Sequence, residues 1–498
     1  MQFGDRNTLA IELHPLSPAW ERLYAPEKTA WSTFALWVGG ENLCRNIIEG
    51  TESVREGINV PLAPLADWLV RSWAFLEFEE RPSRFPPRLS PVITLRRWGD
   101  ASPPRGVDAD DWMEWREEWW SRHFLLAGAD GAQLPSVAFL RSADVVRIEW
   151  APVRFNGARA PRFLAQRGHI LLPWERSEAV FAEFVAYVGG WLREEGLAEL
   201  YPWVQGQDPL RASDMPFLDL LSIYTGRGKD ALLSWAGAGS EQEVRERLGL
   251  GLDTRDPGGS VVTQALRDLP PEANPRLEAE LLNLHQRTLR GGGFDPRLRS
   301  AARDAAGAGA SPEESGYLAA DEVRRQLGLD GQPIRDVDSL LSTLEVAIVD
   351  SGVECTREGM LVGARRGGSA SAVVNLTPRT RMSWGRRFEL ARALGHLLLG
   401  SFRDDALGGA SSAYSQPWMR RRSGAFAAEL LLPTAGVRAC DLSDLDAAAD
   451  PDAFNTLMHE FGVGARTAAY QLWNHGLLSS AEIRDDLIDR FGSPEASG

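Results

Sequence analysis

The chain has 498 residues, of which 44% are hydrophobic and 25% are charged, and its formal net charge is −15. This length predicts two or three domains, and the composition is that of an ordinary soluble globular protein. The acidic balance argues against attraction of the whole protein to nucleic acid, and no apolar run reaches the roughly 18 residues of a transmembrane helix. The N-terminus lacks the pattern of a secretory signal, and the three cysteines form no metal or disulfide spacing, so we expect a cytoplasmic location and no membrane partner.

Lysine occurs only at Lys28 and Lys229. The segment around Lys229 reads YTGRGKDALL, which does not fit the G-x-x-x-x-G-K-[ST] pattern of a P-loop. P-loop NTPase activity and chemistry that needs a lysine-bound pyridoxal cofactor are therefore not expected.

The amino-terminal part is rich in tryptophan, since fifteen of the eighteen tryptophans precede residue 240. Apolar residues at helical spacing predict helices over 64–78, over 108–128 and from Ser177 onward, and two β-rich runs around 142–144 predict a hairpin. This mixture indicates a Trp-rich α+β domain over residues 1–230, which resembles no family that we recognise.

Four aromatic residues can share one face of the helix at 108–128, and this spacing is more typical of a core than of a ligand platform: Trp112, Trp115, Trp119 and Phe124. On the same helix, the spacing of His123 from Glu117 and Glu118 does not bring them onto one face, so all three are predicted to lie on the solvated surface. Three further histidines stand alone in the sequence and are given no functional role: His14, His169 and His285.

The rest of the chain divides by composition. Residues 231–290 are predicted to form a helical extension, residues 291–315 are rich in Gly and Ala and are predicted to form a linker, and residues 316–498 form a second domain. In that domain we expect a strand at 346–350, a hairpin with its turn at 365–368, and a turn at 461–464 between two helices shaped like a helix-turn-helix. The fold class is therefore α+β and multidomain.

The most informative stretch reads RRFELARALGHLLLG, over residues 386–400. It is apolar at helical spacing and is long enough for about four turns. A zinc-peptidase helix reads H-E-x-x-H, in which two histidines bind the metal and the glutamate acts as general base. Only His396 of that pattern is present here, because Arg392 occupies the position of the first histidine and Ala393 the position of the glutamate.

The neighbouring segments extend this comparison. The core helix resembles that of the ImmA/IrrE-like metallopeptidase family, and GAFAAELLLP, at 424–433, resembles the second helix of that family. Segments at 319–349, 372–388 and 457–478 resemble its remaining blocks in the same order. The resemblance covers roughly residues 316–485 and implies a mainly helical zincin-like domain with a small sheet. The amino-terminal domain is not part of it.

The resemblance also implies a third metal ligand, an acid just before the FAA block. No acid occurs there, because residues 420–425 read RRRSGA. Glu389 lies about 10 Å along the helix from His396 and cannot complete the site, and Glu429 is expected to act as a cap or in an ion pair. One imidazole cannot hold Zn²⁺, so we expect no metal, no other cofactor and no hydrolytic catalysis.

Arginine is concentrated where the metal ligands would converge. Residues 378–422 hold nine arginines against three acids, in a chain of net charge −15. A pocket of guanidinium groups would bind an anion such as a nucleotide, a nucleic-acid phosphate or an acidic peptide, and five residues could form it: Arg387, Arg392, Arg420, Arg421 and Arg422. The alternative is that Arg392 and Arg422 pair with Glu389, Glu429 or other acids and fill a dead site.

Three functional hypotheses follow. The first is a non-catalytic ImmA/IrrE-like regulator or sensor that binds a protein partner or an anionic ligand, in the bacterial stress-response, phage-defence or toxin–antitoxin settings that the resemblance implies. The second is an active zinc metallopeptidase whose site is non-standard or is completed by a partner. The third is a transcriptional regulator that binds DNA through the closing helices, although Arg466 is the only cation that the second of these helices offers to a phosphate.

Overall fold

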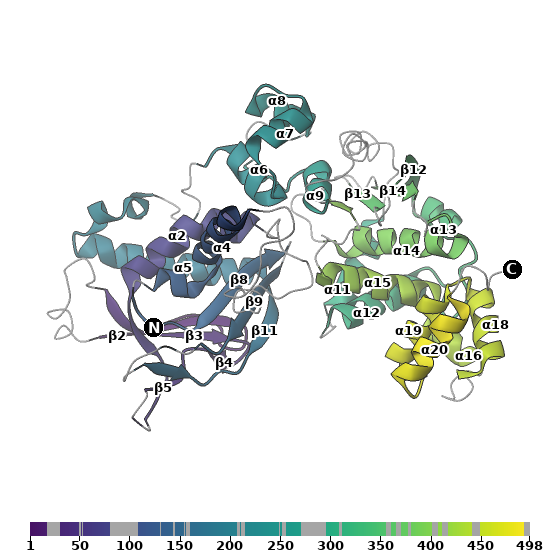
Figure 1. Cartoon of the computed structure of the whole chain (residues 1–498), viewed down its shortest axis with the longest axis horizontal. Helices are drawn as coiled ribbons and strands as arrows, with labels where there is room; N and C mark the ends of the chain where they lie inside the picture. The colour runs from purple at the N-terminus through teal and green to yellow at the C-terminus, as the bar shows by residue number, and fades with distance from the viewer. Residues whose placement is uncertain are drawn as a thin grey trace. The chain divides into compact units, whose positions relative to one another are not determined.

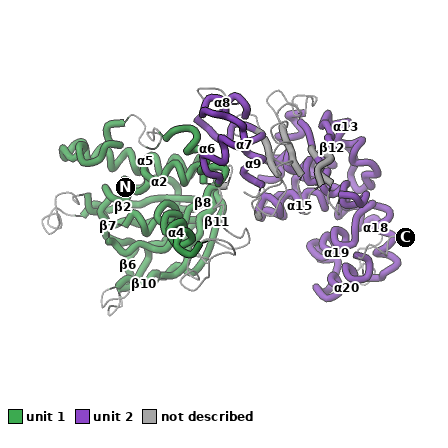
Figure 2. Tube along the Cα trace, turned by 45° about the horizontal axis from the view of Figure 1, so that its top comes forward, with its two compact units in different colours: residues 1–226 green, residues 227–498 purple. Residues whose placement is uncertain are grey.

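The structure is a computed structural model, and it divides the chain into two compact units, Met1–Gly226 and Arg227–Gly498 (Figure 2). Both units contain helices and strands, which confirms the predicted α+β fold class. No helix in the described ranges has both the length and the apolar character needed to cross a bilayer. The structure describes all residues except 17–29, 49–50, 52, 80–107, 130, 143–144, 154, 156–159, 207–209, 211–214, 249, 251–254, 270–294, 308–310, 355–359, 365–369, 377–379, 401–406, 411–416, 441–448 and 493–498.

Antiparallel strands make up the sheets of the first unit (Figure 1). Five of them form one sheet in the order β1-β2-β3-β4, in which β3 also pairs with β7, and two further sheets run β11-β9-β8 and β10-β5-β6. The strands are β1 (Gln2–Gly4), β2 (Leu9–Pro15), β3 (Trp31–Val38), β4 (Glu41–Asn42), β5 (Asn46–Ile48), β6 (Val54–Arg55), β7 (Ile58–Pro61), β8 (Ser136–Ser142), β9 (Val145–Ala151), β10 (Pro161–Phe163) and β11 (Gly168–Pro173).

Helices cover one face of the five-stranded sheet. Alternate residues of β2 and β3 are buried, and Phe3 and Phe34 pack edge-on against Phe184 of the long helix α5. The opposite face of this sheet carries Glu12 and His14 of β2 and Thr33 and Trp37 of β3. The helical elements of this unit are α2 (Leu62–Phe78), α4 (Ala109–His123), η2 (Leu125–Gly128), α5 (Trp174–Glu194), η3 (Ala198–Leu200), η4 (Pro202–Gln205) and α6 (Phe217–Thr225).

The predicted tryptophan helix is α4. Trp112, Trp119 and Phe124 are buried in one cluster with Trp115 packed against it, as the spacing predicts. Asp108 caps the helix by accepting from the backbone N–H groups of Asp110 and Asp111, which accounts for its acidic start.

The prediction for His123 is wrong. Its side chain is fully buried, and its two ring nitrogens lie 2.9 Å from the carbonyl oxygen of Phe139 and 3.0 Å from the carboxylate of Glu79. Glu79 follows α2 and lies 44 positions earlier in the chain, so no local spacing could reveal this pairing. Glu117 and Glu118 are exposed, as predicted.

The second unit is mainly helical and contains one four-stranded sheet in the order β12-β14-β13-β15. Its elements are α7 (Lys229–Ala236), α8 (Glu241–Arg247), α9 (Val261–Arg267), α11 (Pro296–Ala306), α12 (Pro312–Gln326), α13 (Val337–Thr343), β12 (Val346–Glu354), β13 (Met360–Ala364), β14 (Ala370–Leu376), α14 (Ser383–Leu399), β15 (Leu407–Ala410), α15 (Pro417–Leu431), α16 (Thr434–Ala439), α18 (Pro451–Phe461), α19 (Ala465–Asn474) and α20 (Ala481–Phe491).

Helix α14 is the central element of this unit. It packs against α15 and α11 and also contacts β13 and β14 of the sheet (Figure 1). Strand β12 runs parallel to β14, and β13 and β14 form the expected antiparallel hairpin, whose turn lies outside the described residues. Because α14 is covered on several sides, its middle is buried from Glu389 to Gly395.

The linker predicted over 291–315 contains a helix, α11, and α12 begins within it. Asp295 caps α11 by accepting from the backbone N–H of Arg297, and Pro296 occupies the first turn, where its missing N–H costs no hydrogen bond. Leu298 and Ala302 face the core four residues apart. The buried face of α11 consists of one leucine and small alanines. Because these residues give almost no hydrophobic periodicity, the sequence did not predict this helix.

The turn between the closing helices is confirmed. α18 ends at Phe461, Gly462 follows in the left-handed conformation with φ 62°, and α19 begins at Ala465. On α19, Tyr470 and Trp473 lie under the guanidinium of Arg484 from α20, at 4.8 and 5.5 Å from its carbon. These aromatic rings pack against α20, the helix that follows.

Close packing of α12 on α15 yields a stability prediction. A Cβ added at Gly316 would lie 2.3 Å from the backbone oxygen of Arg422, whereas one added at Gly424 would meet nothing within 4 Å. Gly316→Ala is therefore expected to lower the free energy of unfolding by about 2 kcal/mol, and Gly424→Ala to raise it by roughly 0.5 kcal/mol. Urea denaturation of both variants checks this. Equal effects of the two substitutions would contradict the packing.

Candidate functional site

Helix α14 carries the residues that the sequence aligns with the H-E-x-x-H pattern. Arg392 and His396 are four residues apart and therefore lie on one face, and Ala393 is fully buried beside them. The helix has no acid in its first turn and ends at Gly400. Arg392 and Ala393 are thus buried in the second unit, and His396 beside them is half-buried.

The guanidinium of Arg392 is engaged within the helix. Its Nη1 donates to both carboxylate oxygens of Glu389, at 3.2 and 3.0 Å, and the two side chains are only 6% and 5% exposed. In a buried pair of this kind each group compensates the other for the water that both have lost. Arg392, at the position that the resemblance implies for a first metal ligand, is therefore engaged in an internal ion pair with Glu389.

His396 is held neutral. Burial lowers the pKa of its imidazole to about 3, and the positive charges of Arg392 and Arg422 add to this effect. Its Nε2 is buried and has no hydrogen-bond partner among the described residues. Arg422, from α15, donates to the carbonyl oxygen of Leu399 at 2.6 Å and lies over the ring of Trp418 at 4.6 Å. The charges of two guanidinium groups thus act on the imidazole of His396.

The residues present do not fit a zinc ion. A tetrahedral site needs three or four nitrogen, sulfur or oxygen donors, and the described residues contain no group of three or more His, Cys, Asp or Glu side chains placed to hold a metal. The charged groups that act on His396 are the guanidinium groups of Arg392 and Arg422, and these would repel a divalent cation. Ala393 has no group that could act as a general base at its position.

The other predicted anion-binding arginines also make contacts with the protein. Arg387 donates to the carbonyl oxygens of Ile334, Arg335 and Phe461, which ties α14 to the end of α18. Arg421 is exposed and pairs with Glu313 of α12 at 3.3 Å. Arg420 is half-buried. These contacts spread the five arginines over several elements.

Glu429 has the structural role expected of it. Its carboxylate accepts from the backbone N–H and the hydroxyl of Thr434, at 2.7 and 3.0 Å, and so caps α16. It also lies 3.2 Å from Nε2 of His475 and accepts from the amide of Gln471. Although burial acts to raise the pKa of Glu429, its hydrogen bonds with His475 and Thr434 hold it below the usual value.

Asp321 also belongs to this network, and no sequence pattern predicted that it would. Burial raises the pKa of Asp321, on α12, to about 7, and the charge of Glu429 and a hydrogen bond with it act in the same direction. The neighbouring Glu429 carboxylate therefore favours the protonated form of Asp321. Asp321, Glu429 and His475 come from three distant segments, so their meeting depends on the packing of α12, α15 and the end of α19.

The buried ion pair on α14 gives the first prediction for this site. Glu389→Leu leaves the Arg392 guanidinium buried without its acid and should lower the free energy of unfolding by about 3 kcal/mol. The double variant Glu389→Leu/Arg392→Met replaces both charges with apolar groups and should return to within about 1 kcal/mol of the wild type. Urea denaturation measures both. A single variant as stable as the double variant would show that the pair is not needed.

His396 gives a prediction for pH. Its pKa is lower in the folded chain than in the unfolded chain, so the unfolded state binds the proton more readily and stability is lost as pH falls from about 6.5 toward 3. Relative to His396→Gln, the wild type should lose up to about 1.4 kcal/mol per pH unit over this range and nothing above it.

Denaturation curves at several pH values test this difference. His459→Gln, on the exposed face of α18, is the matched control and should keep the pH dependence of the wild type. Parallel curves for His396→Gln and the wild type would contradict a neutral buried imidazole.

The comparisons with known proteins agree with the core helix and its surroundings. Residues 365–472 match the family model described as the IrrE N-terminal-like domain, and this match lies within the range over which the sequence resembles the ImmA/IrrE-like family. The searches of curated proteins and of solved structures found no match to this chain. The carboxyl-terminal region therefore contains an ImmA/IrrE-like domain.

Proposed function

We propose that the carboxyl-terminal unit is a non-catalytic ImmA/IrrE-like module that acts as a regulator or sensor by binding a protein partner. Its setting would be a bacterial stress response, phage defence or a toxin–antitoxin pair, the settings that the resemblance implies. The observation that carries the proposal is the buried Arg392–Glu389 pair, because it occupies the position from which the first metal ligand would act.

The electrostatics of the site favour this proposal over catalysis. Arg392 and Arg422 both lower the pKa of His396, so their charges act where a dication would bind. Ala393, fully buried at the position of the general base, has no group that can take a proton from water. A scaffold of this kind can present a binding surface without a reaction.

A protein partner is favoured over a small anion at the arginines of this site. Arg392 is paired with Glu389, Arg387 is bonded to backbone carbonyl groups, and Arg421 pairs with Glu313. An anion would have to displace these contacts, which lowers its affinity by the cost of breaking them. A partner protein can instead bind the outer surface of the unit and leave the interior as it is.

One observation supports a second candidate, a peptidase completed by its partner. The Nε2 atom of His396 is buried and unpartnered within the described residues, and it is neutral, so its lone pair remains available to a metal. In this case the partner would have to supply the remaining ligands and displace Arg392.

Zinc stoichiometry separates the two candidates. Purified wild-type protein equilibrated with zinc and desalted should retain less than about 0.1 zinc per chain by plasma mass spectrometry, because one imidazole does not hold the ion. About one tightly held zinc per chain, with peptide cleavage that a chelator abolishes, would overturn the non-catalytic proposal.

A rebuilt site provides the positive control. The triple variant Arg392→His/Ala393→Glu/Arg422→Glu restores the two histidines, the base and a third acidic group, and should bind about one zinc per chain. The same variant carrying His396→Gln should lose most of that zinc. Circular dichroism verifies that both variants fold, and the wild-type measurement decides the question if they do not.

A further inference from the structure

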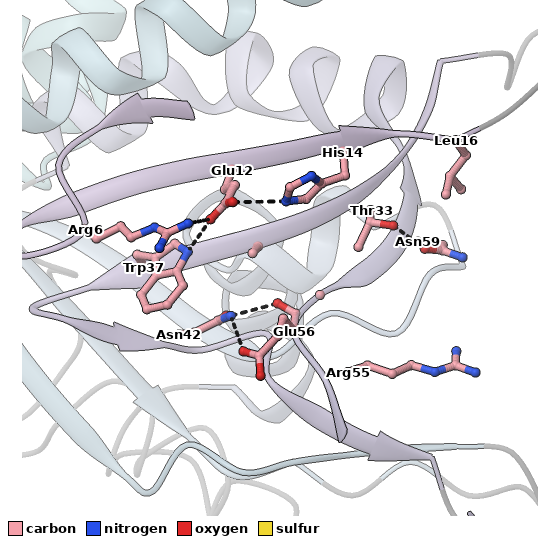
Figure 3. Close-up of a pocket in the computed structure, with 12 residues that line it drawn as sticks. Arg6, Glu12, His14, Leu16, Thr33, Trp37, Asn42, Arg55, Glu56 and Asn59 are labelled. Carbon is pink, nitrogen blue, oxygen red and sulfur yellow. Dashed lines mark hydrogen bonds and ion pairs between the residues drawn. The ribbon is translucent and has the colours of Figure 1, made fainter. Parts of the chain in front are cut away.

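A polar hollow lies on the open face of the five-stranded sheet in the first unit (Figure 3). Its volume is about 760 Å³, which lies within the usual range for small-molecule sites, and twelve residues from β2, β3, β4, β6, β7 and the adjoining loops line it. None of these residues belongs to the ImmA/IrrE-like domain, so the hollow is independent of the function proposed above.

Strand alternation directs polar side chains into this hollow. On β3, Phe34 and Leu36 face the core, whereas Thr33 and Trp37 face the opposite side of the sheet. On β2, Glu12 lies between buried neighbours and points to the same side as Trp37. A Cβ at Gly57 would lie 2.7 Å from the methyl carbon of Thr33, so the chain can approach β3 here only with glycine.

The carboxylates of the hollow are already satisfied. Glu12 accepts from Arg6 at 2.5 Å and from the indole N–H of Trp37 at 3.0 Å, and it also pairs with His14 at 3.0 Å. The prediction that His14 stands alone is wrong, because its imidazole contacts the Glu12 carboxylate. Glu56 pairs with Arg45 at 3.1 Å. Neither acid presents an uncompensated negative charge to a ligand.

The groups that remain are hydrogen-bond donors. Arg55 on β6 is exposed and has no ion-pair or hydrogen-bond partner among the described residues. The Asn59 oxygen accepts from the Thr33 hydroxyl at 2.9 Å, which leaves the amide NH₂ of Asn59 free to donate. Arg6 compensates the charge of Glu12, and Arg45 compensates the charge of Glu56. The positive charge of Arg55 therefore has no counterion among these side chains. The hollow is thus suited to an anion.

An aromatic ring completes the site. The indole of Trp37 is half-buried and lines the hollow, and the guanidinium of Arg6 lies over it at 4.4 Å from the ring centre (Figure 3). The bond from the indole N–H to Glu12 fixes the orientation of the ring. A fixed indole and a planar guanidinium offer stacking surfaces to a flat heterocycle.

We propose that this hollow is a binding site for a nucleoside monophosphate. The phosphate is bound by Arg55 and the Asn59 amide, and the base packs against Trp37 and Arg6. Arg55 contributes charge-assisted hydrogen bonds to the phosphate, and the indole contributes area that does not depend on the identity of the base. The site is therefore expected to require the phosphate group and to accept any of the bases.

Isothermal titration of the full chain with the four ribonucleoside 5′-monophosphates, adenosine and inorganic phosphate tests this proposal. At least one monophosphate should bind. Adenosine lacks the phosphate and inorganic phosphate lacks the base, so each should bind at least about 10-fold more weakly. Arg55→Ala should weaken nucleotide binding by about 10-fold or more.

Arg162→Ala is the matched control. Arg162 is exposed on β10 of the same three-stranded sheet as Arg55 but does not line the hollow, so its removal should change binding less than about twofold. Absence of binding by all four nucleotides, equal binding of adenosine and its monophosphate, or equal loss in Arg55→Ala and Arg162→Ala would each overturn the proposal.

Discussion

A buried charge pair lies inside the central helix of the carboxyl-terminal unit and constrains what can be placed beside it. α14 is enclosed by the sheet and by α11 and α15, so any ion at its middle must be compensated locally. Arg392 and Glu389 compensate each other within one turn, and Arg422 instead uses a backbone carbonyl and an indole face. With its pKa lowered by burial and by these two guanidinium charges, His396 is a neutral residue beside cations.

Much of this unit was predictable because its signals are local. The core helix, the hairpin strands and the turn at Gly462 follow from periodicity and from single residues that need particular backbone angles. Arg392, which the sequence aligns with the first histidine of H-E-x-x-H, is also identified locally, and Glu389 is near enough in sequence to be considered as its partner. The match over residues 365–472 rests on the same segments.

The features that sequence reasoning missed depend on contacts between distant segments. His123 is buried because Glu79 lies beside it in the fold, and Asp321 has a raised pKa because Glu429 comes from another helix. The Glu12–His14 pair is an exception: the two residues are separated by one position on a strand and must share a face. That signal was available in the sequence, but recognising it required the strand assignment.

The two units carry different kinds of candidate site. The amino-terminal unit carries a polar hollow with free hydrogen-bond donors, and the carboxyl-terminal unit carries a buried Arg392–Glu389 ion pair. The most direct measurement of the central claim is anomalous X-ray scattering at the zinc edge from crystals grown with excess zinc. The account predicts no anomalous peak near His396 and an intact Arg392–Glu389 pair, whereas a peak within bonding distance of the His396 imidazole, with Arg392 displaced, would contradict it.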